Sequence, residues 1–313
     1  MEGRSEKDIA HFSKLARQLM KHHFPKKTLK ISPLGGGLTN YVFSVGAGKT
    51  EMVVRISDLP EKIHFFQKEQ WAVARAKEKG IPVPQILEVG NDIIPFPYMI
   101  SNKITGEEST HHKNRLQIIR EMGRYAAVLH TIPTKGFGHL FDWSQNTLSK
   151  NQTWKDYLQC ELNADARLAV LNRHKMILPK ISRVIKKELI NIRKWRQSPC
   201  LHHGDIRLKN TMVDKDGKIL AIIDWENCVS SIGPFWDTSI ALHDLSIEAQ
   251  WQYLEGYGMK SKQLLGYALP LKIFNILNYA PVIEKLSMEK QKETLEHYRA
   301  RLKGALDMFS LLS

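Results

Sequence analysis

The sequence predicts an α+β protein of two lobes, a small N-terminal lobe built on an antiparallel sheet with one or two helices and a larger, mainly helical C-terminal lobe. Three observations predict it. The chain has 313 residues, more than a usual single domain. Strand-like segments separated by glycine turns occupy much of residues 1–101, and beyond them apolar residues recur at helical spacing almost throughout. We therefore expect the lobes to span residues 1–101 and 102–313.

The composition is that of an ordinary globular protein, with 42% hydrophobic and 25% charged residues. The net charge of +14 is compatible with several anionic partners, but no RNA-binding signature or basic zipper accompanies it, so we expect no nucleic-acid partner. No apolar run approaches a membrane span and the N-terminus is charged, which predicts a cytoplasmic protein without a membrane partner. Cys160, Cys200 and Cys228 lack paired spacing, which indicates reduced thiols rather than disulfides or a zinc site.

The N-terminal lobe is expected to begin with an amphipathic helix over residues 6–23. Strand-like segments follow at residues 29–34, 41–45 and 51–57, and a glycine-rich loop separates the first two. Glycines let backbone N–H groups approach phosphate oxygens closely, so this loop is a candidate nucleotide-binding loop. Its candidate residues are Gly36, Gly37, Thr39 and Asn40. A plain hairpin turn is the alternative, because the loop lacks the full G-x-G-x-x-G pattern.

A helix is expected over residues 61–79, ended by Pro82 and Pro84, which lead into another strand-like segment. Residues 95–101, with the sequence PFPYMIS, predict an edge strand, since prolines cannot donate ladder hydrogen bonds. Among the later helical segments, residues 177–196 place their apolar side chains on one stripe and most basic side chains elsewhere. A core-packed helix with a solvated basic face is favoured there over an RNA or membrane patch.

The stretch from His203 to Glu226 carries the chemistry, because it contains the groups needed to move a phosphoryl group. Asp205 can accept the proton of an attacking hydroxyl, while Asn210 and Asp224 offer oxygen ligands to magnesium. Residues 211–223 read as two short strands joined by an Asp-Gly turn, a hairpin that holds the two ends of the motif together. An ordinary loop is the alternative for HGD and Asn alone, and the attached hairpin and IDWE sequence disfavour it.

Loop, hairpin and IDWE together resemble the aminoglycoside phosphotransferase and choline kinase family, whose signature is HGD, four residues, Asn, then I-D-W/F-E/D. The opening GGGLTNYVF resembles the same family. The resemblance implies a two-lobed protein-kinase-like fold and ATP or GTP with Mg²⁺ as donor, bound by the N-terminal lobe. It also implies that Arg55 reaches the phosphates and pairs with Glu69, and that backbone groups near Ser101, Asn102 and Lys103 receive the adenine.

In the C-terminal lobe the resemblance implies catalysis and acceptor binding. Asp205 is then the catalytic base and Asn210 and Asp224 are the magnesium ligands. Arg207 lies where related kinases place a Lys that touches the γ-phosphate, and a bracing role is the alternative. Asp237 matches the family's Asp that supports the catalytic loop from a helix start.

The expected activity is transfer of the γ-phosphoryl group of ATP or GTP to a hydroxyl of a small molecule. Three alternatives remain open for the chain: an aminoglycoside kinase conferring antibiotic resistance, a metabolite kinase acting on choline, ethanolamine, a sugar or a similar compound, and a non-catalytic nucleotide-binding module. A polycationic aminoglycoside requires acidic contacts, since a +14 protein repels it at distance. The candidate acidic residues are Asp156, Glu161, Asp165, Asp244 and Glu248.

Overall fold

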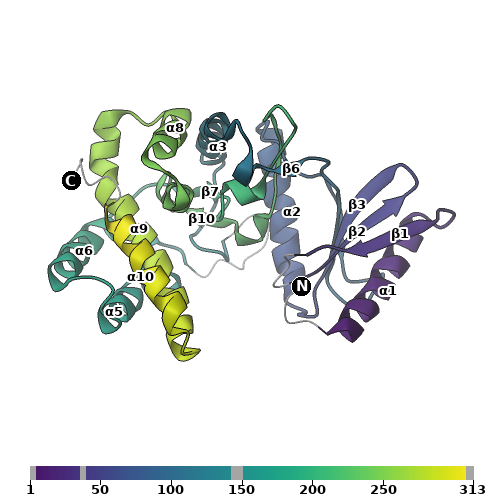
Figure 1. Ribbon diagram of the computed structural model, residues 1–313, viewed down its shortest axis with the longest axis horizontal. Helices are drawn as coiled ribbons and strands as arrows, with labels where there is room; N and C mark the ends of the chain where they lie inside the picture. Colours follow the sequence, from purple (N-terminus) through teal and green to yellow (C-terminus); the bar gives the residue numbers. More distant parts are fainter. Residues whose placement is uncertain (1–4, 36–39, 142–150, 308–313) are drawn as a thin grey trace. The chain divides into compact units, whose positions relative to one another are not determined.

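The structure is a computed structural model that describes residues 5–35, 40–141 and 151–307, and it contains two compact units (Figure 1). One unit comprises Met1–Glu108 and Thr211–Glu226, and the other comprises Ser109–Asn210 and Asn227–Ser313. Residues 211–226 thus belong with the N-terminal part of the chain although they follow the catalytic loop. The functional division at residue 101 stays a prediction.

The first unit is built on a five-stranded sheet with the order β1-β2-β3-β5-β4, in which all neighbours are antiparallel. The strands are β1 (Leu29–Pro33), β2 (Tyr41–Ala47), β3 (Thr50–Ile56), β4 (Ile86–Gly90) and β5 (Tyr98–Asn102). The helices are α1 (Glu6–His23) and α2 (Lys62–Glu78), both within one residue of their predicted bounds. The edge-strand prediction for PFPYMIS is wrong, because Pro95 and Pro97 precede β5 and leave its own N–H groups free to pair on both sides.

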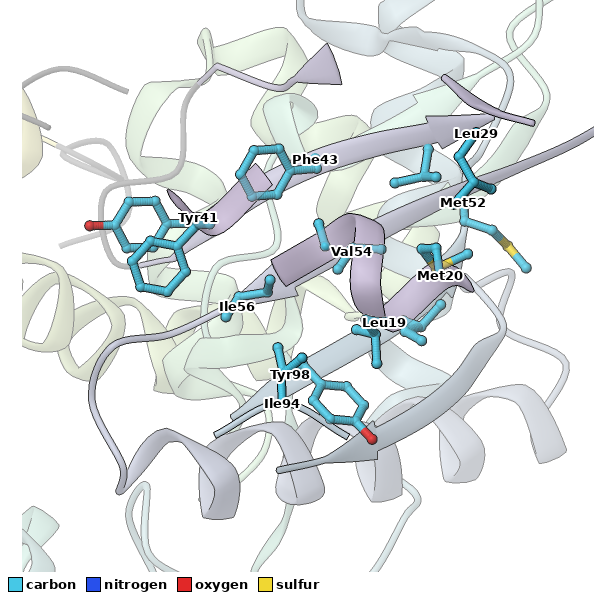
Figure 2. Close-up of a cluster of buried hydrophobic side chains, with 14 of the residues drawn as sticks. Leu19, Met20, Leu29, Tyr41, Phe43, Met52, Val54, Ile56, Ile94 and Tyr98 are labelled. Atoms are coloured by element: carbon cyan, nitrogen blue, oxygen red, sulfur yellow. The ribbon is translucent and has the colours of Figure 1, made fainter. Parts of the chain in front are cut away.

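The core of the first unit forms between α1 and one face of the sheet. In β2 every second residue is buried, which is the period of a strand with one face in a core. Leu19 and Met20 of α1 lie in the same buried cluster as Phe43 and Val54, and Figure 2 shows these side chains together. The predicted amphipathic helix therefore covers one face of the sheet, and α2 packs on the side of the opposite face.

The hairpin predicted after the catalytic loop is present and forms a second, three-stranded sheet with a short strand near residue 107. Its strands are β6 (Glu107–Glu108), β8 (Thr211–Val213) and β9 (Ile219–Ile222), in the order β6-β8-β9. The turn closes by a hydrogen bond of 3.1 Å from the N–H of Asp214 to the carbonyl of Lys218, and Gly217 has a φ of 86°. The N–H of Ile222 also donates to the carbonyl of Pro82 at 2.8 Å, which ties the hairpin to the first unit.

The second unit is mainly helical, with one small sheet of two antiparallel strands, β7 (Cys200–His202) and β10 (Val229–Ser231). Its helices are α3 (Arg115–Leu129), α4 (Trp154–Asp156), α5 (Ala164–Arg173), α6 (Pro179–Ile192), α7 (Phe235–Ala241), α8 (Ile247–Tyr257), α9 (Ser261–Met288) and α10 (Lys292–Asp307). The short helical turns of the chain are η1 (Ser109–His111), η2 (Tyr157–Glu161), η3 (Leu208–Asn210), η4 (Trp225–Asn227) and η5 (Leu242–Asp244).

Helix packing in the second unit depends on close contact between α3 and α8. A side chain at Gly123 would collide with the backbone of Tyr253, and one at Gly256 would collide with the backbone of Arg120. The apolar stripe predicted for residues 177–196 is confirmed in α6, where Ile185, Leu189 and Ile192, spaced four and three residues apart, are buried. Within the described ranges, none of the helices combines the length and apolarity that a membrane span requires.

Candidate active site

The loop that carries Asp205 is anchored at both ends by regular structure within the second unit. Strand β7 precedes it, and β7 pairs with β10 so that His202 lies opposite Val229. The turn η3 ends it at Asn210, and the hydroxyl of Ser109 donates to the carbonyl of Leu208 at 2.9 Å. The loop is therefore a short segment held at both of its ends.

The glycine of the HGD sequence is required by the backbone at this point. Gly204 has a φ of +83°, a conformation that residues with a Cβ seldom adopt. A Cβ at this position would also collide with the carbonyl oxygen of Asn227. Both observations explain why a residue without a side chain stands immediately before Asp205.

Asp237, at the start of α7, holds the loop from inside the unit, as the family resemblance implied. Its Oδ2 accepts the N–H of His203 and its Oδ1 accepts the N–H of Gly204, both at 2.8 Å. His130, the residue that follows α3, lies 3.2 Å from the same carboxylate through Nε2, and His202 lies 3.7 Å away through Nδ1. This buried set has the spacing of metal ligands, but hydrogen bonds to the loop already account for the carboxylate.

The protein surroundings shift the pKa values of Asp237, His202 and the nearby Cys200. Burial by itself raises the pKa of Asp237, but the hydrogen bond from His130 and the electrostatic influence of the neighbouring histidines hold it well below its ordinary value. Burial and the nearby His130 lower the pKa of His202, while Asp237 opposes that shift. Burial also raises the pKa of the Cys200 thiol to about 12, so this cysteine is not a thiolate at neutral pH.

Asp205 itself is nearly buried and its carboxylate is held by three side chains of its own loop. Arg207 Nε lies 2.5 Å from Oδ1, and Lys209 Nζ lies 2.9 Å from Oδ2. The amide nitrogen of Asn210 donates to Oδ2 at 3.0 Å and to the Asp205 carbonyl at 2.8 Å. The structure thus brings together Asp205, Arg207 and Asn210, three of the residues predicted for the site. Lys209 was not predicted as part of the site, although it lies only four residues after Asp205 in the sequence.

Asn210 and Asp224 are the predicted magnesium ligands, and each has a side-chain oxygen. The amide nitrogen of Asn210 is used on Asp205, which leaves the amide oxygen as the atom to offer a metal. Asp224 belongs to the first unit and has a φ of 66°, unusual for a residue other than glycine and typical of functional positions. Both residues therefore supply oxygen donors of the kind Mg²⁺ prefers.

Arg55 and Glu69 form the predicted ion pair in the first unit. Because every second residue of β3 is buried in the core with α1, Arg55 extends from the opposite face of the sheet. There its Nη2 contacts Oε1 of Glu69 on α2, and its guanidinium lies 5.5 Å from the ring centroid of Phe66. The pair is largely shielded from solvent, with side-chain exposures of 15% and 5%. Its role toward a nucleotide stays a prediction.

The glycine-rich loop is only partly within the described residues. Gly36, Gly37 and Thr39 lie outside them, and Asn40 is buried. The amide nitrogen of Asn40 donates to Oε2 of Glu226 at 3.2 Å, and Lys62 Nζ lies 3.8 Å from the same oxygen. Glu226 of the IDWE sequence therefore joins the end of this loop to the start of α2, a function that the sequence analysis did not assign.

The predicted adenine contacts at residues 101–103 meet donors that are already in use. The N–H of Asn102 donates to the carbonyl of Gln85, and the N–H of Lys103 donates to the carbonyl of Glu51, each at 3.0 Å. Ser101 is paired within the sheet on both sides. Contact of this segment with a base through its remaining backbone groups stays a prediction.

Two of the acidic residues considered for binding amines have other partners in the structure. Asp165 pairs with Arg193 at 2.5 Å. Glu161 accepts the N–H of His139 and the amide of Asn151, each at 2.6 Å, and so it shapes the chain around residue 138. Glu161 therefore serves the fold, whereas Asp165 makes its ion pair at the surface, with 66% of its side chain exposed.

The other acidic candidates divide between a helix cap, a surface position and a side chain outside the description. Asp156 accepts the hydroxyl of Thr153 at 2.6 Å at the start of α4. Glu248 is exposed in the first turn of α8. The side chain of Asp244 lies outside the described part of the chain. A role of these acidic residues in binding amines stays a prediction.

The family comparison covers most of the chain. A family model described as the phosphotransferase enzyme family matches residues 30–267. Hygromycin-B 4-O-kinase of Escherichia coli is 23% identical over 206 residues, 63% of this chain and 57% of that protein, so the match spans little more than half its length. An uncharacterized protein in the ileS 3′ region of Staphylococcus aureus is 29% identical over 124 residues, 37% of this chain and 87% of that protein.

Solved structures match nearly the full chain. Aminoglycoside phosphotransferase APH(4)-Ia has a TM-score of 0.66 at 15% identity, covering 95% of this chain and 99% of its own. A thermostable mutant of it in a ternary complex with ADP and hygromycin B has a TM-score of 0.68 at 14% identity, covering 93% and 98%. Macrolide 2′-phosphotransferase MphH from Brachybacterium faecium has a TM-score of 0.58 at 15% identity, covering 92% and 97%. The predicted kinase-like fold and the resemblance on which it rested are confirmed.

Proposed function

Since the chain belongs to the phosphotransferase enzyme family, we propose that it transfers the γ-phosphoryl group of ATP or GTP to a hydroxyl group of a small molecule. The observation that carries this proposal is the Asp205 carboxylate, oriented by Arg207, Lys209 and Asn210 on a loop that Asp237 fixes from below. A module that only binds nucleotide needs no carboxylate fixed in this way.

In the proposed reaction Asp205 accepts the proton of the acceptor hydroxyl as the hydroxyl oxygen bonds to the γ-phosphorus. The bond from that phosphorus to the β–γ bridging oxygen breaks, and the nucleoside diphosphate leaves. Arg207 orients the carboxylate of Asp205 through its contact of 2.5 Å, which favours the bracing role that the sequence left open. The alternative contact of Arg207 with the γ-phosphate stays a prediction.

Donor binding is assigned to the first unit, with the catalytic loop supplying one metal ligand. Arg55, positioned by Glu69, binds phosphate oxygens. Asn210 and Asp224 are the residues that would hold Mg²⁺, which when bound neutralises charge on the phosphates. A reaction that consumes nucleotide requires a compartment that contains it, and the cytoplasmic location is part of this proposal.

Two acceptor classes follow from different observations. The similarity to hygromycin-B 4-O-kinase and to APH(4)-Ia supports an aminoglycoside acceptor and a role in antibiotic resistance. The engagement of Glu161 in the fold supports instead a metabolite kinase, because this carboxylate, expected to receive amines, already has two partners.

The experiment that tests the activity is nucleotide consumption by the purified protein against a panel of antibiotics and hydroxyl metabolites, with Mg²⁺. Replacing Asp205 by Asn keeps the shape and removes the proton acceptor, so turnover should fall by roughly 10²- to 10⁴-fold while nucleotide binding persists. Asp165→Asn makes the same chemical change at the surface and serves as the control. Turnover by Asp205→Asn at the wild-type rate contradicts the assigned role.

A further inference from the structure

The two oxygens of the Asp205 carboxylate have different surroundings within the second unit. Oδ1 is shielded from solvent, and Nε of Arg207 lies 2.5 Å from it. Oδ2 has two partners, the amide nitrogen of Asn210 at 3.0 Å and Nζ of Lys209 at 2.9 Å. An acceptor hydroxyl must donate its proton to one of these two oxygens. Because Oδ1 is shielded, Oδ2 is the oxygen that the hydroxyl has to reach.

The two partners of Oδ2 differ in how firmly they are held. Asn210 is buried, and its amide nitrogen also donates to the carbonyl of Asp205 at 2.8 Å, so it cannot leave without breaking a second hydrogen bond. Within the described part of the chain, the ammonium group of Lys209 has Asp205 as its single polar partner, and 50% of the Lys209 side chain is exposed. A long side chain that reaches solvent can exchange such a contact for water at little cost.

The backbone on both sides of Lys209 is fixed. The hydroxyl of Ser109 donates to the carbonyl of Leu208 at 2.9 Å, and Asn210 is held to the carbonyl of Asp205. Rotation about the side-chain bonds of Lys209 can therefore move Nζ away from Oδ2 while the carboxylate stays in place. Because the Lys209 side chain is half exposed, its departure opens an approach to Oδ2 from the solvent side.

We infer that Lys209 is a gate on the catalytic base: its ammonium group occupies the place at Oδ2 of Asp205 that the acceptor hydroxyl takes, and acceptor binding displaces it. This inference rests on the proposed phosphotransferase function and adds a residue that controls it. An ammonium N–H and a hydroxyl O–H both donate to a carboxylate oxygen, so they compete for the same lone pair. An acceptor contributes binding energy that displaces the ammonium group, whereas a water molecule has few contacts with which to do so.

The reaction that the gate suppresses is hydrolysis of the nucleotide donor. In that reaction water donates a proton to Oδ2 of Asp205 while its oxygen bonds to the γ-phosphorus. The bond from that phosphorus to the β–γ bridging oxygen breaks, and the nucleoside diphosphate and inorganic phosphate leave. Removing the ammonium group of Lys209 opens Oδ2 to water, so hydrolysis should become faster. A residue that only supports the loop predicts the opposite, because a displaced loop slows every reaction that uses Asp205.

The test is the rate at which the full chain releases inorganic phosphate from ATP with Mg²⁺ and without an acceptor, compared with the rate of Lys209→Met. Methionine keeps most of the length of the side chain and removes the ammonium group. Phosphate release should rise by roughly 2- to 5-fold, which corresponds to the strength of an ion pair with an exposed partner. Lys209→Arg returns a cation to the same place and should release phosphate at close to the native rate.

Two further variants serve as controls. Lys187→Met makes the same chemical change at an exposed lysine of α6 and should keep the native rate. The double variant Asp205→Asn/Lys209→Met should lose the increase, because the faster hydrolysis has to use the Asp205 carboxylate. Thermal unfolding checks that each variant is folded, and Lys209→Gln replaces Lys209→Met, with the same expected result, if the latter does not fold.

Three results overturn the inference: phosphate release by Lys209→Met that is no faster than that of the native chain, release by Lys209→Arg that is as fast as that of Lys209→Met, or an increase that persists in the double variant. If an acceptor of the panel is phosphorylated through Asp205 and one of these results is obtained, the inference alone fails. The failure of the proposed function is seen instead as absence of Mg²⁺-dependent nucleotide binding or as acceptor phosphorylation that ignores Asp205→Asn.

Discussion

Replacing Asp237 by Asn perturbs the catalytic loop without touching a residue of the proposed phosphoryl transfer. The native carboxylate is completely buried and accepts two backbone N–H groups, from His203 and Gly204, at 2.8 Å each. An Asn side chain of nearly the same shape has one oxygen and one NH₂ group. One loop N–H then faces a donor, and the other loses its charged acceptor.

The magnitude follows from these two bonds. A hydrogen bond to a charged group contributes about 1.5–3 kcal/mol, a neutral one about 1 kcal/mol, and a buried donor left unsatisfied costs about 1–3 kcal/mol. Removing a buried charge offsets part of this loss. We expect the free energy of unfolding to fall by about 2–4 kcal/mol, which in a unit of this size lowers Tm by roughly 5–15 °C. A loop displaced by about 1 Å loses roughly 10²-fold in kcat.

The assay is thermal unfolding together with acceptor-dependent nucleotide consumption, for Asp237→Asn and for Asp165→Asn as the control. Asp165 makes a single ion pair at the surface, with 66% of its side chain exposed, so its substitution should change the free energy of unfolding by at most about 1 kcal/mol. If Asp237→Asn changes neither Tm nor kcat more than the control does, the carboxylate does not hold the loop and the reasoning is refuted.

Three other predictions concern the Arg55–Glu69 ion pair, the metal ligand Asp224 and the buried His202. Arg55→Gln and Glu69→Gln should each destabilise the chain by about 3 kcal/mol, because each leaves a largely buried charge unpaired, and the double variant should lose less than the sum; additive losses would refute the coupling. Asp224→Ala should weaken nucleotide binding with Mg²⁺ far more than without it, and titrations showing equal losses would remove Asp224 from the metal site. Burial lowers the pKa of His202, so below about pH 6.5 the unfolded chain binds more protons than the folded one. The free energy of unfolding should then fall by up to about 1.4 kcal/mol for each unit by which the pH decreases. Between about pH 6.5 and about pH 5 the Tm of His202→Asn should fall less than that of the native chain, and an equal dependence of Tm on pH would contradict this.

The fold class, the hairpin after the catalytic loop and the order of the chemical groups could all be predicted from the amino-acid sequence. Helix α1 and strands β2 and β3 follow directly from local periodicity, since a stripe or an alternation needs only one buried face. Asp205 and Asn210 are five residues apart in one fixed loop, so their contact was implicit in the motif. Gly204 was likewise visible in the sequence, because its backbone conformation is local.

The distant groups that support these residues, and the partners of the acidic candidates, became visible only in the folded chain. Neither His130 nor Glu226 could be assigned a role from spacing, because their partners are Asp237 and Asn40, more than a hundred residues away. The sequence offered Glu161 and Asp165 as acidic candidates, yet in the fold Glu161 accepts the N–H of His139 and the amide of Asn151, and Asp165 pairs with Arg193. A hydrogen bond or ion pair depends on where the chain returns in space, and local sequence does not encode that position.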